Sequence, residues 1–409
     1  MVKSKFNLIA KFGNKMWYAV FGLVLSMIAA AGAADAFVPN EISVFRDDAW
    51  PVYHFITLDR TEEPVFSEAG DVQTTKADAK LFGVLPIKQV DVNTFAHKKL
   101  YPGGMLFGVK FYTKGVLVVG LSDVESQGTA VNPAYQSGVR LRDIVVSING
   151  KAINPVEEMA ALVTGCNGSS LQFGVSRNGQ PMTFDITPVK SDADSEYKTG
   201  LWVRDSTAGI GTVTFIDPGT NSFAGLGHGI CDVDTGELMP LLKGTVVGVR
   251  INGINRGLSG KPGELKGYFN QDRLGSLTGN TDAGVYGIFS GMPDGAFSEP
   301  VSIGLQSDVQ EGAAQIYCTL SDGLPKAYDI EIVKRNKNSS DTKNFVIRVT
   351  DETLLSETGG IVQGMSGSPI LQNGKLIGAV THVLINDPTR GYGIYIENML
   401  KNMSQLYEE

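Results

Sequence analysis

The stretch Gly364-Met365-Ser366-Gly367-Ser368-Pro369 leads into Ile370-Leu371-Gln372-Asn373-Gly374-Lys375-Leu376-Ile377, two apolar runs joined by an Asn-Gly pair. An Asn-Gly pair between apolar runs is the strongest short-range signal for a tight β-hairpin. Glycine reaches backbone conformations that other residues avoid, so Gly364 and Gly367 permit a tight turn around Ser366. The sequence therefore predicts a serine on a loop that enters a β-hairpin.

A serine hydroxyl is a weak nucleophile at neutral pH, and enzymes activate it with an imidazole and with fixed donors around the attacked carbonyl. We expect Ser366 to be the nucleophile and the amides of Gly364, Met365 and Ser366 to form the oxyanion hole. The spacing resembles the nucleophile loop of chymotrypsin-like proteases. A nucleophile elbow would need a helix after the serine, which the apolar hairpin disfavours. A glycine-rich turn without chemistry is the alternative.

The general base has four candidates, because the chain has only His54, His97, His228 and His382. His228 lies in the small-residue run 225–229, which follows a predicted strand at 212–216 and a turn at 217–220. His382 is the rival, but it ends the strand after the serine hairpin, where a chymotrypsin-like fold has a substrate-binding wall. We expect His228 to be the base, and we interpret His54 and His97 as ordinary side chains.

The acid that would orient the imidazole is less determined, because any carboxylate that reaches His228 could serve. Asp351 follows a predicted strand at 344–349 and precedes Glu352, so it could equally cap a short helix. The open candidates are Asp232, Asp234, Asp282, Asp294, Asp322 and Asp351.

Residues 361–392 and the histidine segment 225–229 resemble the sporulation stage IV protein B peptidases, serine peptidase family S55, of endospore-forming bacteria. The resemblance implies a membrane-associated serine endopeptidase with a PDZ domain and with His228, Asp351 and Ser366 as the catalytic residues. It also implies limited regulatory cleavage in the space between the forespore membranes. The implied targets are the chain itself and then a membrane-bound regulator of the intramembrane protease that activates sigma-K.

Composition agrees with an exported protein of two or three domains. The net charge of −8 and the absence of a Lys/Arg stripe argue against a nucleic-acid partner. Three widely spaced cysteines give neither a disulfide framework nor a zinc site, and we read Cys231 as a small buried residue. We expect no cofactor and no metal.

The N-terminal segment, residues 1–36, carries four lysines ahead of a charge-free apolar stretch at 16–34. Such a stretch is long enough to cross a bilayer as a helix, and the lysines predict that the rest of the chain is extracytoplasmic. Small residues at 31–36 could instead mark a cleavage site, so both a membrane anchor and a cleaved signal remain open. Residues 37–95 predict a strand-rich spacer.

We expect a PDZ domain at residues 96–190, because residues 138–151 resemble the central PDZ signature. The apolar helix predicted at 155–163 suits one wall of a peptide groove. The glycine-rich segment 103–109 resembles the carboxylate-binding loop, which makes C-terminal peptides possible partners. A groove that no longer binds is the alternative. The candidate peptide-binding residues are Leu106, Phe107, Gly108 and Val109.

Residues 191–409 alternate short apolar strands with glycine turns, and an amphipathic helix is predicted from about Glu397. The expected fold is therefore mainly β: a transmembrane segment, a PDZ domain and a chymotrypsin-like (trypsin-like) β-barrel peptidase domain. Two other functions remain open, a catalytically inactive membrane-tethered PDZ adaptor and a general extracytoplasmic quality-control serine protease.

Overall fold

The computed structural model describes residues 38–51, 55–61, 72–293, 299–336 and 342–408, with isolated residues at 21–35, 295 and 297. Most of the predicted membrane segment, together with His54 and Asp294, lies outside the described residues. Among the residues described, no helix is both long and apolar enough to cross a membrane. The chain forms two compact units, Met1–Lys98 with Leu305–Ser307, and Lys99–Gly304 with Asp308–Glu409.

The first unit contains the strands expected of the spacer. They form one sheet in the order β1-β4-β3-β2, in which β1 runs parallel to β4 and the other pairs are antiparallel. Buried Val90 and Val92 on β4 alternate with more exposed residues, as a sheet with one covered face requires. The strands are β1 (Glu41–Phe45), β2 (Ile56–Arg60), β3 (Val72–Leu81) and β4 (Leu85–Phe95).

The first barrel of the second unit is a closed ring of antiparallel strands, because β6 pairs with both β17 and β15. Its core is built from aromatic and branched side chains, including Phe107, Phe223 and Val213. Around the ring the strands are β6 (Leu106–Leu121), β17 (Leu241–Asn255), β18 (Glu264–Thr281), β19 (Gly284–Phe289), β16 (Ser222–Gly225) and β15 (Leu201–Ile216), with β5 (Lys99–Pro102) and β20 (Val301–Ser302) beside β15.

The second barrel is also closed, and it contains the predicted serine hairpin. Asn373 and Gly374 both have positive φ, 51° and 75°, and join β24 to β25 as the Asn-Gly signal predicts. The strands are, in order, β21 (Gly312–Thr319), β22 (Pro325–Arg335), β23 (Phe345–Val349), β26 (Asp387–Tyr395), β25 (Lys375–Leu384) and β24 (Pro369–Gln372); the helices are α4 (Glu352–Thr358) and α5 (Ile396–Glu408).

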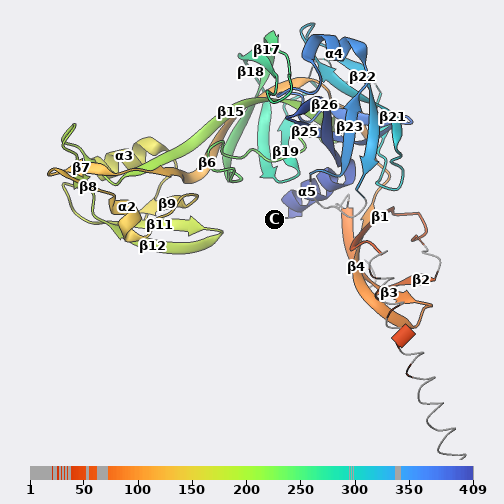
Figure 1. The fold of residues 1–409 in the computed structure, drawn as a ribbon, viewed down its shortest axis with the longest axis horizontal. Coiled ribbons are helices and arrows are strands. Elements are labelled where there is room, and N and C mark those ends of the chain that lie inside the picture. The colour runs from red at the N-terminus through yellow and green to blue at the C-terminus, as the bar shows by residue number, and fades with distance from the viewer. Residues whose placement is uncertain are drawn as a thin grey trace, which may run out of the picture. The chain divides into compact units, whose positions relative to one another are not determined.

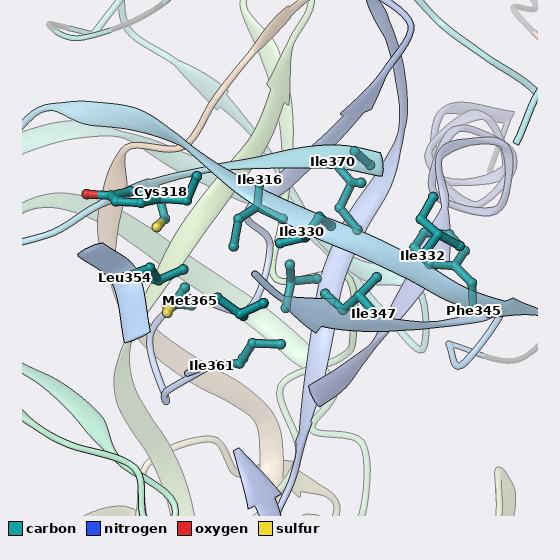
Figure 2. Close-up of a cluster of buried hydrophobic side chains, with 14 of the residues drawn as sticks. Ile316, Cys318, Ile330, Ile332, Phe345, Ile347, Leu354, Ile361, Met365 and Ile370 are labelled. Carbon is teal, nitrogen blue, oxygen red and sulfur yellow. The ribbon is translucent and has the colours of Figure 1, made fainter. Parts of the chain in front are cut away.

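The core of the second barrel also includes the middle of the serine loop. Met365 is fully buried in the same apolar cluster as Leu354 of α4 and Ile361 (Figure 2). Because its side chain faces the core, the backbone on either side of Met365 is held against the barrel. The two barrels therefore confirm a mainly β fold with a β-barrel domain.

The PDZ domain packs two short helices against a sheet whose order is β12-β11-β9-β6 (Figure 1). A second Asn-Gly pair, Asn149 and Gly150, turns β9 into β10 as expected. The elements are β7 (Val124–Ser126), β8 (Thr129–Val131), α2 (Pro133–Ser137), β9 (Ile144–Ile148), β10 (Lys151–Ala152), α3 (Val156–Thr164), β11 (Leu171–Arg177), β12 (Gln180–Ile186), β13 (Val189–Lys190) and β14 (Tyr197–Lys198).

Two long strands, β6 and β15, each run through both the PDZ domain and the first barrel. The first half of β6 pairs with β17 inside the first barrel, and its second half pairs with β9 of the PDZ sheet. Conversely, β15 begins beside the PDZ part of β6 and ends in the barrel. Both long strands are therefore shared by the two domains (Figure 1).

The candidate peptide-binding residues lie in the part of β6 that belongs to the first barrel. Leu106, Phe107, Gly108 and Val109 are the first residues of β6 and lie buried in the barrels rather than at a groove. A run of apolar residues with glycine suits a strand covered on both faces as well as it suits a carboxylate-binding loop. The structure therefore places these four residues in a buried strand and not in a carboxylate-binding loop.

Candidate active site

Two serines lie in the nucleophile loop, residues 363–368, and they differ in exposure and in hydrogen bonding. Ser366 is half-buried, and its hydroxyl donates a hydrogen bond of 2.7 Å to the carbonyl oxygen of Thr381. Ser368 is fully buried, and among the described residues its Oγ has no hydrogen-bond partner. Only Ser366 can be reached by a substrate.

The backbone carbonyls of the nucleophile loop are all held. Buried backbone groups need partners, and here each of five consecutive carbonyl oxygens accepts one hydrogen bond. The donors to residues 363–367 are, in order, Leu265 N at 2.9 Å, Thr212 Oγ1 at 2.7 Å, Ser368 N at 2.9 Å, Thr212 N at 3.0 Å and Thr214 Oγ1 at 2.8 Å.

The amides of the same loop divide into two sets. Gln363, Met365, Gly367 and Ser368 donate to the carbonyls of Gly263, Val362, Val380 and Met365, respectively. The amides of Gly364 and Ser366 donate to no group among the described residues. Two unengaged amides on alternate residues at a nucleophile are what an oxyanion hole requires. Gly364 and Ser366 therefore remain as donors, and Met365 does not, because its amide is already bonded to Val362.

His228 is half-buried, and its Nδ1 lies 2.9 Å from the carbonyl oxygen of Gly229. A carbonyl can only accept, so this contact assigns the proton to Nδ1 and leaves the lone pair on Nε2. Burial lowers the pKa of His228 below its ordinary value of 6.5, although the Gly229 carbonyl raises it in part. The ring is therefore neutral at physiological pH, as a general base must be.

The histidine and serine loops meet at β15 and at β25. The amide of Leu226 donates to the carbonyl of Thr212 at 3.2 Å, and Thr212 also bonds the serine loop. The ring of His228 lies against that of His382, with 4.9 Å between centroids. Because Ser366 bonds the carbonyl of Thr381, the residue before His382, both predicted catalytic residues border the same short segment of β25.

The loop after His228 is fixed by polar side chains from two neighbouring strands. Asn280 accepts from the amide of Ile230 at 2.8 Å and donates to its carbonyl at 2.9 Å. Arg204 forms ion pairs with Asp232 and Asp234, and Asp232 is buried. These contacts hold the backbone that positions the imidazole.

Asp351, which the family resemblance implied as the acid, occupies another place. It is the N-cap of α4, and its carboxylate accepts from the amide of Leu354 at 2.9 Å and from that of Asp329 at 3.5 Å. Among the described residues no carboxylate forms a hydrogen bond with His228. In the structure Asp351 therefore caps α4. The group that accepts the hydrogen bond from Nδ1 of His228 is the carbonyl of Gly229.

The other acidic candidates also differ in their surroundings. Asp232 and Asp234 are paired with Arg204, and Asp322 is paired with Lys326. Asp282 is exposed on the turn between β18 and β19, beside the histidine loop. After burial, the Asp282 charge is the next contribution that raises the pKa of the Cys231 thiol.

The remaining histidine and cysteine predictions have mixed outcomes. His97 stacks on Phe45 at 4.4 Å, which fits an ordinary side chain. Cys166, Cys231 and Cys318 are all free, but Cys231 is exposed and not buried as expected, because it begins a surface turn. No group of three or more His, Cys, Asp or Glu side chains that could hold a metal occurs in the described part of the chain.

The PDZ domain has a groove of about 560 Å³ between α3 and the segment that leads into β15. Met159, Ala160 and Val163 line it from α3, and residues 197–203 line it from the other side. The carbonyls of Thr199 and Gly200 accept from Ala134 N and Ser122 N, whereas the amides of Thr199 and Gly200 have no partner among the described residues. The groove thus lies at residues 197–203 and not at 103–109.

Sequence reasoning missed Thr212, Thr214 and the Gly229 carbonyl. Both threonines are fully buried and lie on the same face of β15. The only available signal was the pattern Thr212-Val213-Thr214 in an otherwise apolar strand, which predicts a polar face but not what it contacts. A backbone carbonyl leaves no sequence signal.

Family models match both the PDZ domain and the region that contains Ser366 and His228. The family model described as SpoIVB peptidase S55 matches residues 195–400, and a PDZ domain model matches residues 103–187. The curated "Putative zinc metalloprotease BH06270" of Bartonella henselae is 30% identical over 108 residues, 26% of this chain and 28% of that protein. A second, from Lactococcus lactis, is 28% identical over 94 residues, 22% of each chain. The chain spans less than a third of the length of these curated relatives.

Solved structures resemble parts of the chain at low sequence identity. The Rv3671c protease of M. tuberculosis in its active form is 14% identical, with a TM-score of 0.30, over 49% of this chain and 74% of that one. The PDZ domain of the SdrC-like protein of Listeria monocytogenes is 18% identical, with a TM-score of 0.19, over 22% and 87%. Because the SpoIVB model matches half of the sequence, the chain belongs to the SpoIVB peptidase family S55, and it contains a PDZ domain.

Proposed function

We propose that this chain is a serine endopeptidase that performs limited regulatory proteolysis during endospore formation, with Ser366 as nucleophile and His228 as general base. One observation carries the assignment of the site. In the loop 363–368 every backbone amide and carbonyl has a hydrogen-bond partner among the described residues except the amides of Gly364 and of Ser366 itself, which carries the accessible hydroxyl. An inactive adaptor would have no need of such an arrangement.

The reaction begins when the Ser366 hydroxyl rotates from the Thr381 carbonyl toward His228. Oγ bonds to the carbon of the scissile peptide while Nε2 of His228 takes the hydroxyl proton. The negative oxygen of the tetrahedral intermediate accepts hydrogen bonds from Gly364 N and Ser366 N. His228 then returns the proton to the leaving amine, which departs. Water attacks the acyl-enzyme carbonyl while His228 takes its proton, and His228 then gives that proton to Ser366 Oγ as the acid product leaves. Throughout, the Gly229 carbonyl holds Nδ1–H.

The substrates that we propose are inferred from the family to which the chain belongs. They are the N-terminal region of the chain itself and then a membrane-bound regulator of the intramembrane protease that activates sigma-K. The four lysines before residues 16–34 support an extracytoplasmic peptidase domain, anchored or secreted, between the forespore membranes.

The PDZ groove supports a peptide partner with a free C-terminus. The unengaged amides of Thr199 and Gly200 lie at a turn where Gly200 has a φ of 79°. Amides of such a turn suit a terminal carboxylate, while apolar Met159 and Val163 suit its last side chain. We therefore propose that the groove binds apolar C-termini.

The function is tested in the native membrane with the full chain, as wild type and as Ser366→Ala. We expect self-cleavage and cleavage of the co-expressed regulator only in wild type, and failure of late spore development with Ser366→Ala. Equal processing by both would reject Ser366 as the nucleophile. Cleavage of denatured proteins in general, with no effect on the regulator, would instead support a quality-control protease.

The groove is tested by filling it. Ala160 and Ala161 are both exposed on α3, but only Ala160 lines the groove. We expect Ala160→Arg to abolish binding of a fluorescent peptide that ends in a free apolar residue, and Ala161→Arg to leave it unchanged. Binding of the amidated peptide as tightly as the free acid would contradict carboxylate capture.

A further inference from the structure

Thr212 uses all three of its polar groups at the candidate active site. Its hydroxyl donates to the carbonyl of Gly364 at 2.7 Å, and its amide donates to that of Ser366 at 3.0 Å. Its carbonyl accepts from the amide of Leu226, two residues before His228, at 3.2 Å. One residue of the first barrel thus joins the nucleophile loop to the loop of the base.

The two carbonyls that Thr212 holds lie on the peptide groups next to those of the oxyanion amides. A peptide group is planar, so its N–H points opposite to its C=O. The peptide groups that carry the Gly364 and Ser366 amides alternate with the two groups whose carbonyls Thr212 binds. The Gly364 carbonyl lies on the peptide group between the two donor groups, so its rotation would turn both amides away from a common point.

The contact is also protected from water. Thr212 and Thr214 are each fully buried, and Met365, between the two donor residues, is anchored in the core of the second barrel. Breaking the hydrogen bond to the Gly364 carbonyl would leave the buried Thr212 hydroxyl without a partner, which is costly. The bond is therefore favoured in the folded protein.

We propose that Thr212 is a positioning residue, which fixes the peptide group between the two oxyanion donors and so keeps the oxyanion hole formed before substrate binds. This inference rests on the proposed catalytic role of Ser366. It assigns Thr212 no contact with the reacting atoms. Its effect reaches the substrate through the amides of Gly364 and Ser366.

The chain offers a matched control on the same strand. Thr214 is equally buried and donates to the Gly367 carbonyl at 2.8 Å, on the far side of Ser366 from the two donor amides. Thr→Val removes only the hydroxyl hydrogen bond at each site, because valine has nearly the same shape. Thr212→Ser restores the hydroxyl and serves as the rescue.

The test uses the full chain and a fluorophosphonate, whose phosphoryl oxygen occupies the oxyanion hole after attack by serine. Thr212→Val should lower the maximal inactivation rate constant about 10- to 100-fold, with the half-saturating concentration nearly unchanged. Thr212→Ser should recover most of that rate. Thr214→Val should lower the melting temperature about as much as Thr212→Val but slow the inactivation much less than Thr212→Val does.

The outcomes separate this inference from the proposed function. If wild type itself is not labelled at Ser366, the catalytic proposal fails. If wild type is labelled but Thr212→Val reacts at the wild-type rate, or if Thr214→Val is slowed equally, the positioning role of Thr212 is contradicted while the catalytic proposal stands.

Discussion

Gly367 touches Thr212 so closely that no side chain fits between them: a Cβ on Gly367 would lie 2.0 Å from the carbonyl oxygen of Thr212. It would also lie 2.4 Å from the amide nitrogen of Leu226. The residue after the nucleophile therefore lies against both β15 and the histidine loop. The distance between Ser366 and His228 depends on this contact.

We expect Gly367→Ala to lower the free energy of unfolding by about 2–4 kcal/mol and kcat/KM by at least about 100-fold, because the loop must move to admit the methyl group. Gly374→Ala is the control, since Gly374 also has positive φ but has open space around its Cβ position. It should cost about 1 kcal/mol and leave activity unchanged. Denaturant unfolding and fluorophosphonate kinetics measure both effects. Equal losses for the two variants would contradict the contact.

Asp351 is predicted to act through the stability of α4. Asparagine is as good an N-cap as aspartate, whereas alanine costs about 1 kcal/mol. We expect Asp351→Asn to unfold like wild type, Asp351→Ala to be destabilised by that amount, and both to keep kcat/KM within about tenfold. Loss of activity by about 10⁴-fold in Asp351→Asn, with unchanged melting, would instead assign Asp351 to the catalytic triad.

The pH dependence of activity follows from His228. Burial lowers its pKa, so the imidazole stays unprotonated, and able to accept the serine proton, at a pH below its ordinary value of 6.5. We expect the acid limb of the fluorophosphonate inactivation rate to fall below pH 6.5. Circular dichroism at each pH is the control for unfolding. An acid limb at or above pH 6.5 in folded protein would contradict a desolvated base.

Ser368 provides a test of which serine matters. Its buried hydroxyl has no partner among the described residues, and an unsatisfied buried hydroxyl costs about 1–3 kcal/mol. Ser368→Ala should therefore raise the melting temperature slightly or leave it unchanged, with full activity. A clear drop in melting temperature would mean that this hydroxyl bonds a group that the described structure lacks.

The parts of the fold that the sequence predicted correctly are those with local causes. Asn373-Gly374 and Asn149-Gly150 form their turns wherever the flanking strands pair, and α5 begins at Ile396 where its apolar periodicity starts. The tight turn around Ser366 was predictable because Gly364 and Gly367 adopt positive φ there, 99° and 94°.

The structure differs from the expectations where the contacting residues are distant in the sequence. Residues 103–109 predicted a carboxylate-binding loop, but the start of β6 pairs with β15 about 100 positions later, which no local pattern reveals. Asp351 had two local interpretations, and only the position of α4 distinguishes them. The amide of Met365 was expected to donate to the oxyanion. It donates instead to the carbonyl of Val362, and the Met365 side chain is buried.

The most direct test of the account is to map the fluorophosphonate adduct by tandem mass spectrometry in wild type, Ser366→Ala and Ser368→Ala. We predict one adduct, on Ser366, in wild type and in Ser368→Ala, and none in Ser366→Ala. An adduct on any other residue of folded wild type, or labelling that survives Ser366→Ala, would contradict the assignment of Ser366 as the nucleophile.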